Sequence, residues 1–401
     1  MQALARDDLP LHALATRLLA VAEAGLPAMY RPEDDTFAFT MVGTRAADGG
    51  WRLARRGTST RYAAITALGA QYLPEGRQRA VLGGHSAEEF TGLLVQRLPE
   101  VANLGDAALI AWAAAETGHP KLADALARTA ALDAGGGPRY TVEAAWVLSA
   151  LAAARESEAG GAELERRLRT ARDRLLRARI AGSPLFPHAT GAGLVPWYRA
   201  HVACFADQTY PLQALARTHA SAAGSGGDPE ALAAAEACAT RICELQGAGG
   251  QWWWHYDARP GRIVEGYPVY SVHQHAMAPT ALFDLADAGG TDFSAAIRHG
   301  LSWMTEVPEL AAGSLGGSPV GPPAGPPAEP MILDDLGVTW RKVHRGDPRK
   351  AVRAGQGLAS LALPGRRLAL LDRVYRPASV DRECRPYEFG WMLHAWLGGA
   401  R

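Results

Sequence analysis

The chain has 401 residues, and its 41 Lys and Arg balance its 41 Asp and Glu, so the formal net charge is zero. A neutral chain lacks the basic footprint by which proteins bind the phosphate backbone of nucleic acids. Hydrophobic residues make up 48% of the chain, but Pro, Gly and His interrupt its longer uncharged stretches. A membrane-spanning helix needs roughly 18 apolar residues in a row. We therefore expect no nucleic-acid partner and no transmembrane segment.

The N-terminal segment is typical of a helix rather than of a targeting signal. Its apolar residues between 9 and 26 follow one helical face, and Asp7 and Asp8 stand where a signal peptide carries positive charge. We therefore expect a cytoplasmic enzyme or binding protein. Nothing in the sequence indicates the oligomeric state.

The four cysteines, Cys204, Cys238, Cys243 and Cys384, form no CxxC pair and show no metal-ligand spacing. This pattern is typical of reduced structural thiols. We therefore predict no metal and no cofactor.

Amphipathic segments recur along the chain, and several carry helix start signals. Ser86 with Glu89 forms a capping box, and Asp228 is followed by a first-turn Pro229. A helix with one charged side packs its other side on a core and leaves the charged side in water. We predict six such outer helices, at residues 9–26, 86–98, 120–131, 162–180, 228–245 and 291–304.

A second set of segments is apolar on nearly all sides, as in AALIAWAAA and VEAAWVLSALAAA. A helix without a polar face is buried on every side. We predict six such inner helices, at residues 59–71, 105–116, 140–153, 206–220, 272–285 and 386–397. Because the two kinds alternate, the predicted fold is an all-α (α/α)6 toroid of six hairpins. It forms a single domain over residues 1–401.

Long connections precede several inner helices. Residues 37–56 read as a strand, a turn at DGG and a returning strand, and QWWWHY is followed by DARPG and RIVEGY in the same manner. An insertion at 307–383 holds a Gly/Pro-rich stretch over 313–330 and a further hairpin at MILDDLGVTWRKV. The connection 181–201 is rich in Pro, Gly, His and aromatic residues. Long loops on one face of a scaffold usually form a site, and six helix N-termini there favour anionic or strongly polar ligands.

Polar and aromatic residues gather where the predicted inner helices begin, which is unusual for helices that are otherwise apolar. Together they would line a funnel at one end of the toroid. The residues at the helix starts are Arg61, Tyr62, Asp106, Tyr140, Glu143, His201, Asp207, Gln208, Tyr210, Tyr270, His273, Gln274, His275, Arg385, Tyr387 and Glu388. The second predicted hairpin adds Trp252, Trp253, Trp254, His255, Tyr256, Asp257 and Tyr267.

Several of these residues also fit a purely structural role. Asp207 either caps its helix or acts as an acid or base when burial shifts its pKa. His273 and His275 lie two positions apart, so they cannot share a helical face, and only one of them would point inward. In a strand, Trp253 would face opposite its two neighbours and could stack on a sugar ring. Arg385 and Arg61 are either ordinary ion-pair partners or a bidentate grip on a carboxylate.

Some segments resemble a known repeat. CELQGAGGQW, with Gln246, Gly250 and Trp252, is similar to the QW motif of squalene and lanosterol cyclases and of related prenyltransferase repeats. DGGW and YTVEAAWVLSAL resemble the same unit, and ADQTYPLQAL resembles the acid-bearing helix of the cyclases. The resemblance implies an α/α toroid. The DxDD motif of the cyclases is absent, since Phe205 and Gln208 occupy the places of two of its acids, and the zinc-ligand pattern of protein prenyltransferases does not occur.

The mixture of ionisable, amide and aromatic residues in the predicted funnel favours a ligand with many hydroxyl groups. We predict a carbohydrate-active enzyme that acts on an anionic, uronate-containing glycan as a lyase, an epimerase or a hydrolase. A lyase or epimerase would use Tyr270 or a histidine, His273 or His275, as base, whereas a hydrolase would pair Asp207 with Glu388. The predicted substrate-binding residues are Arg61, Tyr62, His201, Gln208, Tyr210, Trp253, His255, Tyr256, Tyr267, Gln274, Arg385 and Tyr387.

Two alternatives stay open at this point. A terpenoid-cyclase-like enzyme would use Asp207 as proton donor in a closed aromatic pocket, with His and Arg turned away from its centre. A non-catalytic binding module on the same scaffold would present an open groove without a buried acid. In each case the partner is a small molecule or an oligosaccharide.

Overall fold

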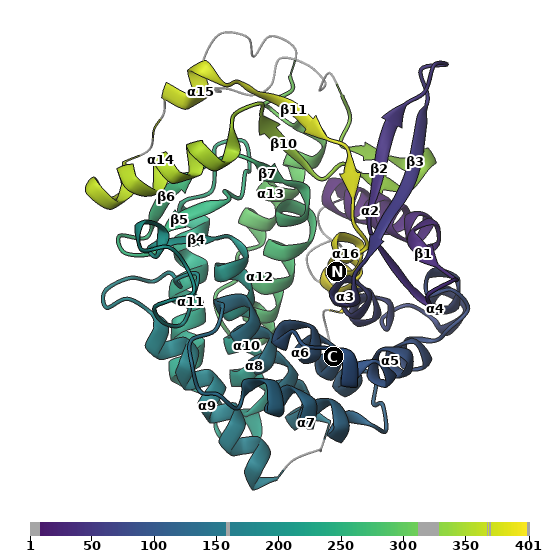
Figure 1. Cartoon of the computed structure of the whole chain (residues 1–401), viewed down its shortest axis with the longest axis vertical. Helices are drawn as coiled ribbons and strands as arrows, with labels where there is room; N and C mark the ends of the chain where they lie inside the picture. Colours follow the sequence, from purple (N-terminus) through teal and green to yellow (C-terminus); the bar gives the residue numbers. More distant parts are fainter. Residues whose placement is uncertain (1–8, 158–160, 312–328, 367, 369, 399–401) are drawn as a thin grey trace.

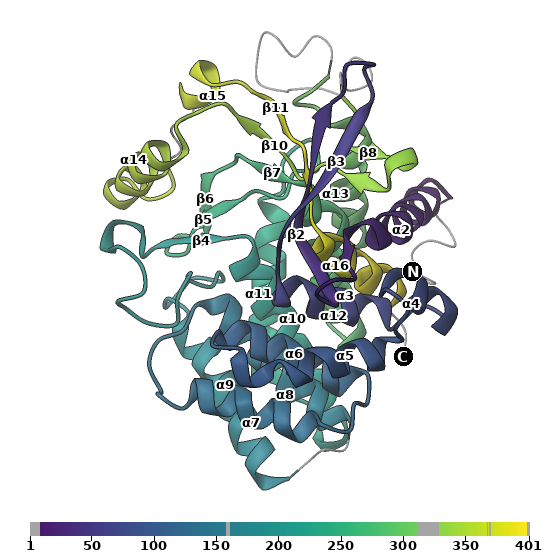
Figure 2. The same cartoon turned by 45° about the vertical axis from the view of Figure 1, so that its right-hand side comes forward.

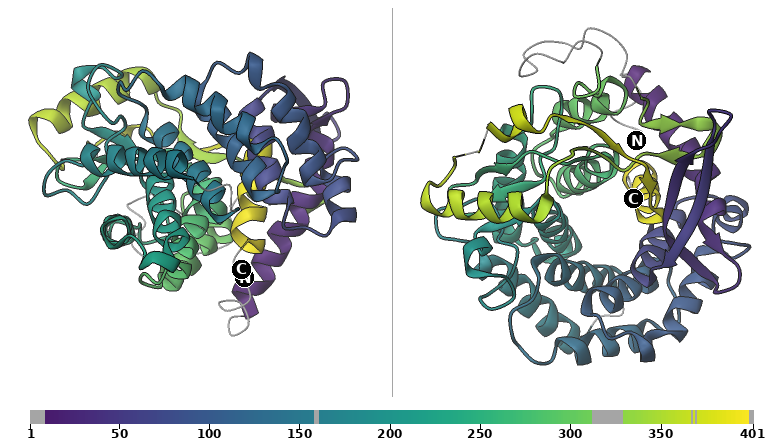
Figure 3. Two further views of the ribbon diagram at one scale, coloured as in Figure 1. Left: turned by 90° about the horizontal axis from the view of Figure 1, so that it is seen from below. Right: turned by 45° about the horizontal axis from the view of Figure 1, so that its top comes forward.

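Six helical hairpins close into a double-walled ring in the computed structural model, which describes residues 9–157, 161–311, 329–366, 368 and 370–398 (Figures 1 and 3). The right-hand view of Figure 3 looks along the ring axis. Each inner helix contacts the next one, and the last contacts the first. The predicted (α/α)6 toroid is therefore confirmed.

The outer wall matches the predicted amphipathic segments. Ser86 and Glu89 form the capping box that starts the second outer helix, and Asp228 accepts a hydrogen bond from the N–H of Ala231 at the fifth. The outer helices are α2 (Leu9–Met29), α5 (Ala87–Gln96), α7 (Leu122–Asp133), α9 (Ala162–Ala178), α11 (Pro229–Glu244) and α13 (Ser294–Glu306). Short helices lie between them: α4 (Glu75–Val81), η1 (Leu98–Glu100) and η3 (Ala223–Ser225).

The inner wall consists of the predicted apolar segments. One start differs from a regular helix, because His273–Met277 (η4) forms a π-helical turn, a deviation that is frequent at functional sites. The inner helices are α3 (Thr60–Ala70), α6 (Leu104–Glu116), α8 (Thr141–Glu156), α10 (Ala206–Ser221), α12 (Ala278–Asp287) and α16 (Pro386–Leu397). Glycine lets the first and last of them close the ring, because a Cβ on Gly69 of α3 would collide with the carbonyl oxygen of Gly390 of α16.

Aromatic side chains close the ring axis part-way along its length. The ring of Tyr210 on α10 lies 5.1 Å from that of Trp146 on α8 and 5.8 Å from that of Trp391 on α16. Because α12 stands between α10 and α16 in the ring, the contact between Tyr210 and Trp391 crosses the interior. We call these three rings the floor, since they close the axis at this level, and we call the ring axis the well.

The antiparallel strands gather on the side where the inner helices begin (Figure 2). The predicted hairpin at 37–56 is present, with Thr40 opposite Arg56, and the predicted hairpins after Trp254 and at 332–339 are also present. One sheet contains β1 (Tyr30–Arg31), β2 (Thr36–Arg45), β3 (Trp51–Thr58) and β12 (Glu383–Cys384). The others contain β4 (Val202–Cys204), β5 (His255–Asp257) and β6 (Arg262–Glu265); β7 (Val269–Tyr270), β10 (Lys342–Arg345) and β11 (Pro377–Asp381); and β8 (Ile332–Leu333) with β9 (Val338–Thr339).

The insertion at 307–383 adds two more helices above the ring, α14 (Arg349–Ala362) and α15 (Leu370–Val374) (Figure 1). It also contains the short η6 (Asp334–Leu336). Residues 312–328, which hold most of the Gly/Pro-rich stretch, lie outside the described residues. The prediction about that stretch therefore stays open.

Among the described residues, α2 is the helix whose length and apolar composition would suffice to cross a membrane. In the ring this helix packs against α16 and α4, and its buried residues include Leu18, Leu19 and Leu26. The apolar side of α2 is therefore buried within the ring, where α2 forms part of the outer wall.

Candidate active site

We call the end of the well at which the inner helices begin the mouth. It comprises the first turns of these helices and the connections that pack on them. Its members on the helices or directly before them are Arg61, Tyr62, Asn103, Asp106, Tyr140, Glu143, Asp207, Tyr270, His273, Arg385, Tyr387 and Glu388. Three groups of side chains can be distinguished there.

The first group joins three consecutive inner helices through Asn103. This residue caps α6, and its Oδ1 accepts the N–H of Asp106 at 3.0 Å and Nη2 of Arg61 at 2.9 Å. Its Nδ2 donates to Oε1 of Glu143 on α8 at 3.0 Å, and Nε of Arg61 donates to Asp106 at 2.8 Å. All these groups keep some exposed surface. Two carboxylates on neighbouring helices therefore face solvent at fixed positions.

The second group is a histidine supported by a buried carboxylate. Nδ1 of His188, in the connection before α10, lies 2.7 Å from Oδ2 of Asp207, which also accepts the N–H of Cys204 at 2.7 Å. Gln208 holds this connection through both backbone groups of Phe186. The side chain of Asp207 has no exposed surface, whereas that of His188 is 35% exposed. This arrangement leaves Nε2 of His188 as the ring nitrogen for a ligand.

The environment of His188 sets its charge. Burial disfavours the charged imidazolium, but the hydrogen bond that His188 donates to Asp207 and the negative charge of Asp207 outweigh burial and raise the pKa of His188. A raised pKa increases the protonated fraction of the imidazole at a given pH. The dyad of His188 and Asp207 therefore has the geometry and the charge of an acid–base group whose orientation is fixed by a buried acid.

The third group lies on α16 and α3. Nε of Arg341, which follows β9, is 3.6 Å from Oε1 of Glu388, and Nη1 of Arg385 donates to the hydroxyl of Tyr62 at 3.0 Å. The ring of Tyr62 stacks on that of Tyr387 at 4.5 Å. The side chain of Glu388 has no exposed surface. Burial raises the pKa of Glu388 to about 7, against the opposing charges of Arg341 and Arg385.

Aromatic rings complete the circle on the side of the π-helical turn. Tyr270 lies 5.7 Å from Trp254 and 5.0 Å from His273, and His273 packs on Phe205 at 4.5 Å. Burial lowers the pKa of His273 to about 3, so this histidine stays neutral. It is therefore a poor candidate for a base that must take up a proton near neutral pH.

The structure brings eight of the predicted site residues together at the mouth: Arg61, Tyr62, Asp207, His255, Tyr270, His273, Arg385 and Tyr387. Glu388 lies there too, but beneath Arg341, so its contact is with this arginine rather than with solvent. Tyr210 lies deeper, in the aromatic floor.

Other predicted site residues hold the framework. Gln208 and Gln274 bond backbone groups. His275 is fully buried, and neither of its ring nitrogens has a hydrogen-bond partner among the described residues. His201 binds Ser360 of α14 at 2.7 Å, Tyr256 is fully buried beside Phe205, and Tyr267 faces a pocket at the rim. Trp253 donates to the carbonyl oxygen of Leu245, whereas Trp254 with the stacked His255 reaches the mouth.

Four residues of the mouth were not among those named from the sequence: Asn103, His188, Arg341 and Arg199, the last on η2 (Trp197–Arg199). Asn103 directly precedes α6, and the other three lie in connections rather than at the start of an inner helix. The Pro, Gly, His and aromatic content of residues 181–201 was the available signal for His188 and Arg199.

A set of potential metal ligands coincides with the acid–base dyad. One ligand atom each of His188, Cys204 and Asp207 lies within 4.8 Å of the others. Burial raises the pKa of the Cys204 thiol, which keeps it protonated when no cation is nearby. These three residues come from separate segments, so sequence spacing could not reveal them, and the prediction of no metal stays untested.

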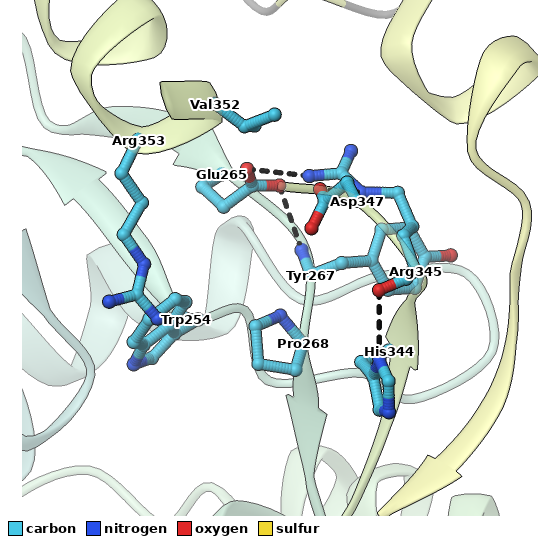
Figure 4. Close-up of a pocket in the computed structure, with 9 residues that line it drawn as sticks. All are labelled: Trp254, Glu265, Tyr267, Pro268, His344, Arg345, Asp347, Val352 and Arg353. Atoms are coloured by element: carbon cyan, nitrogen blue, oxygen red, sulfur yellow. Dashed lines mark hydrogen bonds and ion pairs between the residues drawn. The ribbon is translucent and has the colours of Figure 1, made fainter. Parts of the chain in front are cut away.

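A small open pocket lies at the rim between α14 and the strands β6 and β10 (Figure 4). Trp254 and Arg353 line one side of it. On the other side, Glu265 accepts hydrogen bonds from Arg345 and from the N–H of Tyr267. The rim pocket therefore adjoins the mouth through Trp254.

No family model and no curated protein matches the chain, but solved structures do. An unsaturated glucuronyl hydrolase specific for heparin is 16% identical, with a TM-score of 0.55 and 96% of both chains covered. The unsaturated glucuronyl hydrolase of Bacillus sp. GL1 is 13% identical, with a TM-score of 0.54 and 95% of this chain and 94% of that chain covered. Cellobiose 2-epimerase of Bacillus thermoamylovorans is 10% identical, with a TM-score of 0.51 and 92% and 94% covered. At these identities the similarity shows the fold: the chain is an (α/α)6 toroid over nearly its whole length.

Proposed function

We propose that the chain is a carbohydrate-active enzyme that transfers protons to and from an anionic glycan at the mouth, with His188 as its acid–base group. The observation that carries this proposal is the pairing of a solvent-reaching imidazole with a fully buried carboxylate at 2.7 Å. A positioned histidine of this kind is a general acid or base near neutral pH. Its partners at the mouth then define the substrate.

The other side chains of the mouth suit a sugar. The stacked rings of Tyr62 and Tyr387 offer a surface for the apolar face of a pyranose, and Asn103, Asp106 and Glu143 offer hydrogen bonds to hydroxyl groups. Arginine side chains add affinity for a carboxylate. The names of the similar structures, two glucuronyl hydrolases and a sugar epimerase, support the same substrate class.

Each residue of the dyad has a separate task. Asp207 accepts a hydrogen bond from Nδ1–H of His188. This bond orients the ring, and the carboxylate stabilises the cationic form of the imidazole. Nε2 of His188 then removes the proton α to a uronate carboxylate in a lyase or epimerase. In a hydrolase it would act with Asp106 or Glu143, whose carboxylates flank the same mouth. Asp207 is thus a positioning residue, and His188 is the proposed catalytic residue.

The proposal is tested with His188→Ala and Asp207→Asn on matched neutral and uronate-containing oligosaccharides. Three readouts cover the three reactions: new reducing ends, absorbance of an unsaturated product, and epimer formation by NMR. We expect the wild type to give one of these signals and His188→Ala to lower kcat about 10²- to 10⁴-fold with little change in KM. Asp207→Asn should lower kcat and also move the pH dependence of kcat to lower pH, because it removes the interaction that raises the pKa of His188.

The matched control is His12→Ala, since His12 is an exposed histidine on the outer helix α2. This variant should keep full activity. If the wild type turns over none of these oligosaccharides, or if His188→Ala is as active as the wild type, the proposal fails. If the wild type and the variants bind an oligosaccharide but none of them turns it over, the result would favour a non-catalytic binding module. Turnover of a polyprenyl substrate would favour the cyclase.

A further inference from the structure

Two arginines lie side by side at the edge of the mouth beneath α14. Nη1 of Arg199 donates to the backbone carbonyl oxygen of Arg353 at 3.0 Å. The guanidinium of Arg353 lies over the ring of Trp254, 4.1 Å from its centre, and His255 stacks on the same tryptophan at 3.9 Å. We call this group, Arg199, Arg353, Trp254 and His255, the cationic shelf.

The cationic shelf differs from the rest of the mouth in its charge balance. Arg61 pairs with Asp106, Arg385 pairs with Glu383, and Arg341 pairs with Glu388. By contrast, Arg199 forms no ion pair with a carboxylate within the part of the chain that the structure describes. A half-buried arginine without an acidic partner is costly unless an anion binds to it.

The neighbouring groups show the same crowding of positive charge. Burial and then the charge of Arg353 lower the pKa of Arg199. Burial, followed by the charges of Arg199 and Arg353, lowers the pKa of His255 far below its ordinary value. Arg199 and Arg353 therefore lie close enough for their charges to repel each other, and His255 stays neutral beside them. Such sites commonly bind anions.

The orientation of α14 supports a functional origin for this crowding. A surface helix normally buries its apolar side. In α14, Gln356 and Ser360 are buried and Arg353 is half-buried on the inner side, whereas Leu358 is 49% exposed. Ser360 binds His201, and the carbonyl oxygen of Ser360 accepts Nη2 of Arg259 at 2.8 Å. The helix is thus fixed with its polar side toward the mouth and the rim pocket.

We infer that the cationic shelf is an oxyanion subsite. Arg199 and Arg353 would bind a carboxylate or sulfate group of the sugar next to the one with which His188 exchanges a proton. The rim pocket lies directly beside the shelf, since Trp254 and Arg353 line both (Figure 4). Its carboxylates, Glu265 and Asp347, both pair with Arg345. The identity of the ligand as a sugar rests on the proposed function, whereas the binding of an oxyanion does not.

The direct test is isothermal titration of the whole protein with sodium glucuronate, glucose 6-sulfate and glucose at constant ionic strength. The wild type should bind the two anions and not glucose, and the stronger anion identifies the group that the shelf recognises. Arg199→Met should weaken anion binding at least 10-fold, because a charge-assisted pair of hydrogen bonds is lost. Arg353→Met should weaken it as well, and Arg199→Lys should keep part of it because the charge remains.

The control is Arg166→Met on the outer helix α9, where Arg166 pairs with Glu163 at the surface. It should bind anions as the wild type does. Equal affinity of the wild type for glucose and glucuronate, absence of binding to all three probes, or unchanged anion binding by Arg199→Met and Arg353→Met would each overturn the inference. Anion binding without turnover of any oligosaccharide would leave the subsite and remove the proposed function. Turnover of an oligosaccharide that does not depend on Arg199 or Arg353 would support the proposed function and remove the subsite.

Discussion

The two ends of the well both bury charged side chains, but they satisfy them differently. At the opposite end from the mouth, Glu116 on α6 accepts hydrogen bonds from Trp112 at 3.0 Å, from Tyr72 at 3.4 Å and from Arg217. Nearby, Gln213 donates to Asp284 at 2.9 Å. We call Glu116, Gln213, Arg217 and Asp284 the base.

At the mouth, neither carboxylate oxygen of Glu388 has a hydrogen-bond partner among the described residues, and the same holds for Oδ1 of Asp207. Buried polar groups in folded proteins are nearly always hydrogen-bonded, and the exceptions need an explanation. The comparison shows that burial of charge does not by itself mark a functional site. The base is partnered as a structural cross-link between helices, whereas the mouth contains buried acceptors without a hydrogen-bond partner among the described residues.

The largest effect that can separate the two ends is expected at the base. Arg217→Met would leave the fully buried Glu116 without its cation, so the free energy of unfolding should fall by about 3–5 kcal/mol. Urea unfolding of the variant and of the wild type measures this loss. The kcat of the folded fraction should stay unchanged, since the base lies on the far side of the aromatic floor. Adding Glu116→Gln to the variant should recover part of the stability.

A loss below about 1 kcal/mol in Arg217→Met would show that the base contributes little, since typical surface ion pairs are worth that much. A fall in kcat without a fall in stability would be equally contrary, because it would connect the base to the chemistry.

The ring could be predicted from the sequence because many residues contribute to the helical periodicity of its apolar positions. The segments around Ala108 and Ala145 lack a polar face, and this pattern identifies inner helices without any tertiary information. The helix α14 was not among the predicted elements. Its buried side carries Arg353, Gln356 and Ser360, so the rule that apolar residues face inward does not apply to it.

For the site, residues at helix starts could be predicted, and residues in connections could not. Arg61 and Asp207 were found because a polar residue at the start of an apolar helix is unusual. His188 and Arg341 lie in connections without a period, so only the folded chain places them beside Asp207 and Glu388. The choice of Trp253 assumed the alternation of a strand, but residues 251–254 are irregular, and Trp254 is the one that reaches the mouth. The terpenoid-cyclase resemblance and the predicted compartment stay predictions.

The buried acid of the mouth, Glu388, should appear in the pH dependence of stability. Burial raises the pKa of Glu388 from 4.5 to about 7, so the folded chain keeps a proton that the unfolded chain has lost. Stability from this group is therefore present below about pH 4.5 and falls as the pH rises toward 7, by roughly 3 kcal/mol in total. Urea unfolding between pH 4 and pH 8 measures this slope.

Glu388→Gln should remove that part of the slope, because an amide does not titrate. Asp284 at the base also has a pKa raised by burial, to about 6, so a smaller fall should remain in the variant at lower pH. Identical slopes in wild type and variant would show that Glu388 is ionised throughout, and the contrast between the mouth and the base would then lose its main electrostatic support.

The smallest expected effect compares two helix caps, one at the mouth and one on the outer wall. The side chain of Asn103 caps α6 at 3.0 Å, and that of Ser86 caps α5 at 3.1 Å. Replacing either by alanine should lower the free energy of unfolding by about 1 kcal/mol. Asn103 additionally holds Arg61 and Glu143, so Asn103→Ala should also lower kcat/KM about 10-fold, a loss of about 1.4 kcal/mol in the transition state. Ser86→Ala should leave kcat/KM unchanged, and equal catalytic losses in the two variants would mean that Asn103 acts only as a cap.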